Sequence, residues 1–196
     1  DIMKVIGMTG GTGAGKSTVC AALARLGAET ADADKIAHEV SDPGGAAYAE
    51  LVREFGSGII CDGGRIDRKK LSRIVFSDRE KLKKLNEITH KYVYAELQRR
   101  IDGCRADVIV LDVPLLFEKG SPIRYDLTVA VTADSETRLA RIMARDGIDR
   151  DAALARMKNQ MTDSEYARLA DLCVENGADA DAAQLAARIM QAVQTK

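Results

Sequence analysis

The stretch with the clearest chemistry is residues 7–18, GMTGGTGAGKST. Residues 10–17 match the pattern GxxxxGK[ST], in which glycines let successive backbone N–H groups converge on one anion. Lys16 can bridge the β- and γ-phosphates, and Ser17 can ligate Mg²⁺. The stretch predicts a nucleoside triphosphate site at Gly11, Thr12, Gly13, Ala14, Gly15, Lys16, Ser17 and Thr18.

The second predicted strand, a short one, ends on two aspartates in the order Asp32, Ala33, Asp34. In a short strand both carboxylates lie on one face, at the carboxyl end of a sheet where ligands bind in open α/β folds. One carboxylate could accept the proton of an attacking hydroxyl. The alternative is that Asp34 caps a helix beginning at Lys35, and the residues alone favour neither interpretation.

Three arginines recur at helical spacing in residues 138–145, RLARIMAR. Arg138, Arg141 and Arg145 are three and four residues apart, so they share one face of a helix. Arginines grouped in this way suit the anionic oxygens of a transferring phosphoryl group. The alternative is an exposed face that pairs with nearby acidic side chains.

Composition excludes several other classes of protein. The 196 residues carry a net charge of −1, 4% aromatic residues and no Trp, which does not suit a nucleic-acid-binding surface. The four cysteines form no CxxC pair, so we expect neither a zinc site nor a disulfide framework, and we expect a cytoplasmic protein. No apolar run is long enough to predict a membrane span.

The elements that must position these residues alternate between strands and helices. Helices separate the apolar segments, which predicts right-handed crossovers and a parallel sheet with helices on its faces. Helix-rich insertions lie between the second and third strands and between the fourth and fifth. The five predicted strands are residues 4–9, 28–33, 107–113, 126–132 and 172–175.

Two other phosphate-loop classes fit poorly. A GTPase needs an NKxD motif, which the chain lacks. A mechanical ATPase commonly has adjacent acidic residues at a strand end, whereas VIVLD at 108–112 is followed by an acidic residue only at Glu118. A small-molecule kinase fits the loop, the aspartates and the arginines together.

Six stretches in one order span nearly the whole chain: residues 7–18, DADKIAHEV at 32–40, LNEITHKYV at 85–93, DVPLLFE at 112–118, RLARIMARDG at 138–147, and Gln160, Ala170-Asp171 and Asn176-Gly177. With these stretches the chain resembles the dephospho-CoA kinase family. The resemblance implies a P-loop kinase fold with three layers (α/β/α), a helical substrate domain and a lid. It also implies transfer of the ATP γ-phosphoryl group to the ribose 3′-hydroxyl of dephospho-CoA, with Mg²⁺.

The resemblance also implies a division of the chain. Residues 1–34, 106–137 and 171–196 would form the nucleotide-binding core, residues 35–105 the acceptor-binding insertion, and residues 138–170 the lid. Two positions depart from the family, which commonly has proline where this chain has Lys91 and Thr162.

Roles for single residues follow from the same resemblance. Asp34 becomes the expected base, with Lys16 and Arg141 as the other catalytic residues. Asp112 is expected to orient Mg²⁺ through water, and Asn176 to contact ATP. The expected acceptor-binding residues are Asp34, His90, Leu115 and Phe117.

Purely structural roles remain as alternatives for some of these residues. His90 could be a packing residue, residues 114–117 could be ordinary core, and Asn176-Gly177 could be only a turn. Two other functions also remain. One is a kinase for a nucleoside monophosphate or a sugar acid, and the other is a non-catalytic nucleotide-binding regulator. We expect only small-molecule partners, neither nucleic acid nor membrane, and the residues do not predict an oligomeric state.

Overall fold

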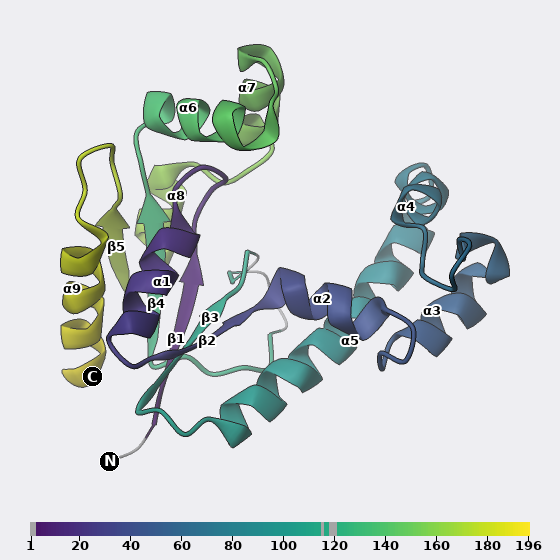
Figure 1. Ribbon diagram of the computed structural model, residues 1–196, viewed down its shortest axis with the longest axis horizontal. Helices are drawn as coiled ribbons and strands as arrows, with labels where there is room; N and C mark the ends of the chain where they lie inside the picture. Colours follow the sequence, from purple (N-terminus) through teal and green to yellow (C-terminus); the bar gives the residue numbers. More distant parts are fainter. Residues whose placement is uncertain (1–2, 115, 118–120) are drawn as a thin grey trace. The chain divides into compact units, whose positions relative to one another are not determined.

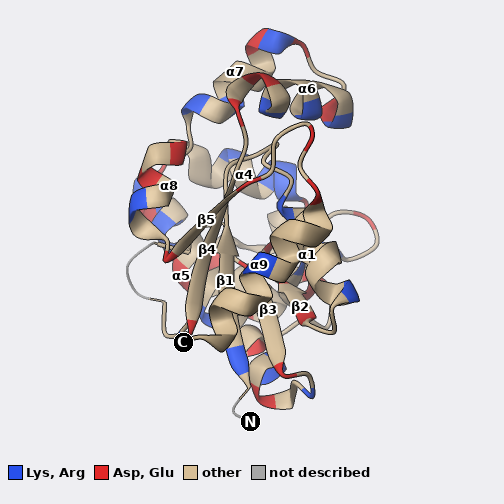
Figure 2. Ribbon diagram, turned by 90° about the vertical axis from the view of Figure 1, so that its left-hand side faces the viewer, with Lys and Arg blue, Asp and Glu red and all other residues tan. Residues whose placement is uncertain are grey.

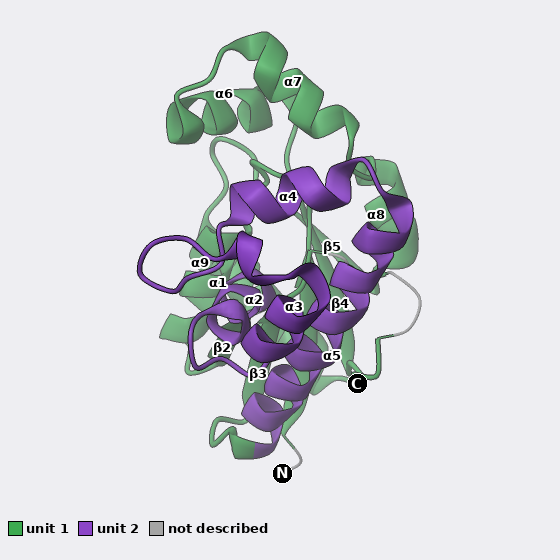
Figure 3. Ribbon diagram, turned by 90° about the vertical axis from the view of Figure 1, so that its right-hand side faces the viewer, with its two compact units in different colours: residues 1–31, 103–196 green, residues 32–102 purple. Residues whose placement is uncertain are grey.

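The computed structural model describes residues 3–114, 116–117 and 121–196. The chain divides into two compact units, coloured separately in Figure 3. Unit 1 comprises Asp1–Ala31 and Gly103–Lys196, and unit 2 comprises Asp32–Asp102. No described helix is both long enough and apolar enough to cross a membrane.

The centre of unit 1 is a five-stranded sheet with the strand order β2-β3-β1-β4-β5 (Figure 1). β1 runs parallel to β3 and to β4, and β4 runs parallel to β5. Near-continuous apolar strands are typical of parallel sheets covered on both faces, and the predicted sheet is confirmed. The strands are β1 (Lys4–Thr9), β2 (Glu29–Asp32), β3 (Val108–Asp112), β4 (Leu127–Thr132) and β5 (Leu172–Glu175).

Helices cover both faces of this sheet. α1 (Lys16–Arg25) and α9 (Ala182–Gln194) contact each other and share a buried core with Ile6 and Met8 of β1. Side chains alternate along a strand, so Thr9 points to the opposite face, where it meets Tyr166 of α8 (Asp163–Leu169). The predicted three-layer α/β/α arrangement is therefore confirmed.

The arginine-rich segment of unit 1 has a small core of its own. α6 (Ser135–Asp146) and α7 (Arg150–Lys158) pack through Leu139, Ile142 and Ala153, away from the sheet core. α6 carries arginines, and α7 carries arginines and a lysine, all coloured blue in Figure 2.

Unit 2 is helical, as the spacing predicts. Its longest helix runs without a break through Lys91, where family members commonly have proline. Lys91 and Tyr92 both donate to Glu50, at 3.0 and 2.6 Å, and so join α5 (Arg79–Gly103) to α3 (Tyr48–Phe55). The helices are α2 (Ala33–Ser41), α3 (Tyr48–Phe55), a 3₁₀ turn (Ser57–Ile59), α4 (Arg68–Phe76) and α5 (Arg79–Gly103).

Candidate active site: a phosphate loop with bound carbonyl groups

The predicted phosphate loop lies between β1 and α1, at the carboxyl end of the sheet. Gly15 is the N-cap of α1 with a φ of 83°, a left-handed conformation that favours glycine. It forms no side-chain cap, so the first N–H groups of α1 have no capping acceptor from it. A helix start of this kind favours an anion, both through its N–H groups and through the helix dipole.

Asn176 binds the carbonyl side of this loop. Its amide nitrogen donates to the carbonyls of Ala14 and Gly15 at 3.0 and 3.3 Å, and only 4% of the residue is exposed. The C=O and N–H groups of a trans peptide point in opposite directions. Asn176 therefore directs the N–H groups of Gly15 and Lys16 away from itself, toward the anion position.

Asn176 itself comes from the end of β5, where its N–H donates to Thr132 at 2.7 Å. A side chain at position 15 would collide with it, because a Cβ there would lie 2.2 Å from the Asn176 amide nitrogen. The sequence predicted that Asn176 contacts ATP. In the structure its side-chain contacts are with the loop.

Arg141 lies on the same carbonyl side. Its guanidinium donates to the backbone oxygens of Asn176 and Gly177 at 2.8 and 3.0 Å, and more weakly to Gly13 and Ala14 at 3.3 and 3.4 Å. These bonds orient the loop. A direct contact with a transferring phosphoryl group would require Arg141 to exchange some of them.

The other two arginines of α6 differ sharply in exposure. Only 6% of the Arg138 side chain is exposed, whereas 60% of the Arg145 side chain is exposed. Arg145 donates to Thr12 Oγ1 at 3.2 Å and to Asp146 at 2.7 Å, and the hydrogen bond from Arg145 lowers the pKa of Asp146. Helical spacing placed all three arginines on one face, but their environments are not equivalent.

Lys16, Ser17 and Asp112 form the candidate nucleotide and metal site. Lys16 Nζ lies 3.9 Å from Asp112 Oδ1 and 3.3 Å from the Gly10 carbonyl. Asp112 is the last residue of β3, whereas Ser17 is exposed in the first turn of α1. No three His, Cys, Asp or Glu side chains in the described ranges form a cage for a metal. A hydroxyl and one carboxylate suit Mg²⁺, which is commonly bound through few protein oxygens together with substrate phosphates and water.

The two aspartates at the start of unit 2 have separate roles. Asp32 caps α2, accepting from the N–H groups of Asp34 and Lys35 at 2.9 and 3.1 Å. Asp34 is exposed, and its carboxylate has no partner within the part of the chain that the structure describes. The helix begins at Ala33 rather than Lys35, so the capping alternative considered for Asp34 applies to Asp32.

The other residues predicted to bind the acceptor are half-buried or lie outside the described residues. His90 is half-buried in α5 and meets Tyr94 edge-on, with ring centroids 5.9 Å apart. Phe117 is half-buried, and Leu115 lies outside the described residues, as does Glu118. Asp34 and His90 belong to unit 2, and Phe117 belongs to unit 1.

Two contacts near the loop were not predicted. Gln160 accepts a hydrogen bond from the Thr12 N–H at 2.7 Å, and Asp163 accepts one from Arg138 at 3.3 Å. Thr162, where the family commonly has proline, forms a capping box with Glu165 at the start of α8. Gln160 belongs to the stretches that resemble the family, but no local pattern indicates its partner, which is 148 residues away.

Comparisons with known proteins show the family of this chain. The family model for dephospho-CoA kinase matches residues 4–182. The dephospho-CoA kinase of Carboxydothermus hydrogenoformans is 44% identical over 178 residues, covering 89% of this chain and 86% of that protein. The dephospho-CoA kinase of Aquifex aeolicus is 42% identical, covering 89% of each chain.

Solved structures show the same fold. A Thermus thermophilus crystal structure superposes with a TM-score of 0.84 at 36% identity, covering 98% of each chain. Dephospho-CoA kinase from Campylobacter jejuni follows with a TM-score of 0.62 at 27% identity, again covering 98% of each chain. Shikimate kinase from Acinetobacter baumannii shares the fold alone, with a TM-score of 0.53 at 19% identity.

Proposed function

The chain belongs to the dephospho-CoA kinase family, and we propose that Lys16 holds the donor phosphates while Asp34 receives the proton of the acceptor. The enzyme phosphorylates the ribose 3′-hydroxyl of dephospho-CoA with ATP, giving coenzyme A and ADP. In the proposed reaction the 3′-oxygen bonds to the γ-phosphorus and the bond to the β,γ-bridging oxygen breaks. The hydroxyl proton moves to the Asp34 carboxylate, and ADP leaves.

The observation that carries this assignment is the contrast between Asp32 and Asp34. Capping of α2 occupies Asp32, and the neighbouring carboxylate remains exposed. A general base must keep an acceptor oxygen available for the proton it receives, and its contribution is about 10²- to 10⁴-fold in rate. Asp34 meets that requirement with both oxygens, whereas Asp32 uses Oδ1 for the cap and has Lys35 Nζ 3.9 Å from Oδ2.

On the donor side, we propose that the triphosphate lies along residues 11–18. The support is the bound carbonyl face of the loop, which leaves the N–H groups of Gly15 and Lys16 directed toward an anion. The exposed hydroxyls of Ser17 and Thr18 follow in the first turn of α1. Because phosphoryl transfer depends on alignment and charge stabilisation, a loop with a fixed backbone is the main requirement.

Mg²⁺ is part of the proposal. Ser17 would bind it directly, and Asp112 would orient it through water, supported by the 3.9 Å distance from Asp112 to Lys16. When bound, the ion would neutralise charge on the β- and γ-phosphates. Lys16 would leave Asp112 and the Gly10 carbonyl to contact the phosphates.

Two arginines of α6 have different proposed roles. We propose that Arg141 acts on catalysis by orienting residues 13–15, because its guanidinium binds backbone carbonyls. Arg145 supplies the exposed positive charge for the transferring phosphoryl group, since it reaches Thr12 at the loop. Residues 138–170 are the proposed lid and residues 35–105 the proposed acceptor-binding part.

The acceptor is tested by measuring ADP release with dephospho-CoA, with nucleoside monophosphates and with gluconate, each at the same ATP concentration. We expect turnover that depends on dephospho-CoA and exceeds that with the other acceptors by several orders of magnitude. Equal turnover with another acceptor would support the wider small-molecule kinase interpretation. ATP binding without turnover on any acceptor would support the regulator. We expect the enzyme to act in the cytoplasm, in keeping with its four cysteines, which form no disulfide bond in the described chain.

A further inference from the structure

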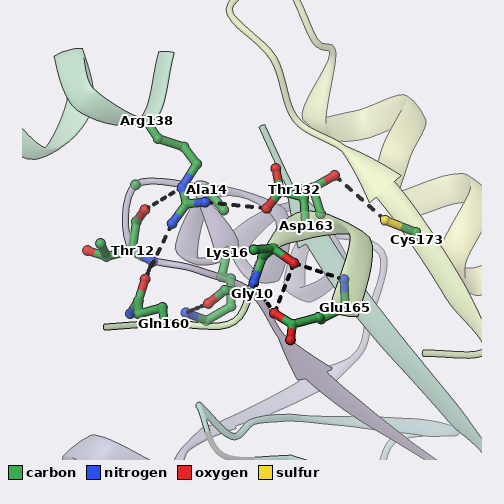
Figure 4. A network of polar contacts seen from close by, with 12 residues as sticks. Gly10, Thr12, Ala14, Lys16, Thr132, Arg138, Gln160, Asp163, Glu165 and Cys173 are labelled. Atoms are coloured by element: carbon green, nitrogen blue, oxygen red, sulfur yellow. Dashed lines mark hydrogen bonds and ion pairs between the residues drawn. The ribbon is translucent and has the colours of Figure 1, made fainter. Parts of the chain in front are cut away.

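All three polar groups of Thr12, in the phosphate loop, are bound by side chains from residues 138–160. The Thr12 N–H donates to Gln160 Oε1 at 2.7 Å, and the Thr12 carbonyl accepts from Arg138 Nε at 2.9 Å. Its hydroxyl accepts from Arg145 at 3.2 Å. Figure 4 shows Arg138 and Gln160 directed at Thr12. The peptide groups before and after Thr12 are thus both held.

Arg138 is itself fixed in place. It is 5% exposed, and its two terminal nitrogens donate to Asp163 Oδ1 and to Gln160 Oε1, each at 3.3 Å. A buried guanidinium is costly unless its N–H groups are paired. The Gln160 oxygen therefore serves two donors, the Thr12 N–H and Arg138, and links them.

The parts of this cluster come from separate elements. Arg138 lies in α6, Gln160 follows α7, and Asp163 begins α8, where the Thr162–Glu165 capping box sets the helix start. The loop makes room for it at Gly11, where a Cβ atom would lie 2.2 Å from Arg138 Nη2. A glycine at this position thus permits the close approach of the guanidinium, in addition to any role in turning the chain.

We propose that Gln160 and Arg138 are positioning residues that clamp Thr12 and hold the phosphate loop in its nucleotide-binding conformation before the nucleotide arrives. A glycine-rich loop loses much conformational freedom on ordering. A clamp made within the protein removes that cost from the binding step, which is how preorganisation raises affinity. The inference rests on the proposed donor site at residues 11–18, and neither residue needs to contact the substrate.

The test replaces Gln160 with side chains of similar size. Gln160→Met removes the acceptor oxygen, whereas Gln160→Glu keeps an acceptor for both Thr12 and Arg138. We measure the dissociation constant for ADP by calorimetry, the KM for each substrate, and Tm. For Gln160→Met we expect about a tenfold rise in the ADP dissociation constant and in the KM for ATP, with an unchanged KM for dephospho-CoA. We also expect a small fall in Tm, because the buried Arg138 loses one acceptor. Gln160→Glu is expected to recover most of this loss.

The matched control is Asn159→Ala. Asn159 is the exposed neighbour of Gln160, with no side-chain hydrogen bond in the described part of the chain, and its replacement should leave all four values unchanged. An unchanged ADP dissociation constant in Gln160→Met would overturn the clamp. So would equal losses in Gln160→Met and Gln160→Glu, or a fall in Tm with no change in the KM for ATP.

These readouts separate the clamp from the proposed function. If the wild-type protein showed no turnover with dephospho-CoA, the proposed acceptor chemistry would fail. The ADP dissociation constants of the variants would still decide whether Gln160 positions the loop.

Discussion

Protein side chains bind polar groups of the phosphate loop, whereas the Asp34 carboxylate at the start of unit 2 is left exposed. Around the loop, protein side chains bind all three polar groups of Thr12 and the carbonyls of Ala14 and Gly15. At the start of α2, Asp34 keeps an exposed carboxylate with no partner among the described residues. Binding a triphosphate needs backbone N–H groups fixed in direction. Proton transfer instead needs a carboxylate oxygen with a lone pair that no hydrogen bond already uses. The difference reflects these two requirements.

The largest effect should come from replacing Asp34, whose carboxylate has no partner among the described residues. We expect Asp34→Asn to lower kcat by about 10²- to 10⁴-fold, because asparagine keeps the shape of aspartate but cannot take the proton. ADP affinity should not change, as measured by calorimetry. The control is Asp62→Asn, another exposed carboxylate of unit 2, which should retain full turnover. A wild-type kcat in Asp34→Asn would show that Asp34 is not the base of this reaction.

The next effect separates two arginines of α6. Arg145→Ala should lower kcat by about 10²-fold with a smaller change in ADP affinity, because its exposed charge is proposed to act on the transferring group. Arg141→Ala should weaken ADP binding and turnover together, because it orients the loop. Arg168→Ala, an exposed arginine of α8, serves as the control. If Arg141→Ala lowered kcat alone, Arg141 would be the residue that meets the phosphoryl group.

A smaller effect distinguishes the two aspartates by stability. Asp32→Ala removes the side-chain cap of α2 and should lower the free energy of unfolding by about 1 kcal/mol. Asp34→Ala should leave stability nearly unchanged, since its carboxylate makes no bond to lose. Urea unfolding followed by circular dichroism measures both. Equal losses in the two variants would contradict the assignment of the cap to Asp32.

The smallest effect is the pH dependence of folding stability, for which we compare one carboxylate from each unit. Hydrogen bonds from Lys196 and Thr128 lower the pKa of Asp171 to about 2, and a hydrogen bond from Arg99, with a further one from Arg100, lowers the pKa of Glu96 to about 2. Both values lie below those of unfolded chains. The stabilisation is therefore present above about pH 4.5 and is lost as pH falls toward 2.

Asp171→Asn and Glu96→Gln should each lower Tm at pH 7, and the gap to wild type should narrow between pH 4.5 and 3. We expect less than about 1 kcal/mol for Asp171, because solvent screens its partly exposed ion pair with Lys196. A gap that stayed constant down to pH 3 would show that the lost contacts do not depend on ionisation.

Local patterns were enough for much of the fold. Segments of four to seven residues, most of them apolar, predicted the parallel strands. The helix boundary near Asp32 differs from the predicted one, because an aspartate, an alanine and a second aspartate offer two possible caps two residues apart. The choice depends on where the strand stops pairing, which is a property of the whole sheet.

By itself, the sequence determined the phosphate loop, the order of the strands and helices, and the family. These depend on residue types at short spacings, so they can be recognised without distant contacts. Only the tertiary structure decided which of the three arginines on one face of α6 is buried and which aspartate caps α2. Arg138 is buried because Thr12 and Gln160 approach it from 126 residues before and 22 residues after in the chain. Helical spacing fixes which side chains share a face, but the partners of that face come from segments that meet only when the chain folds.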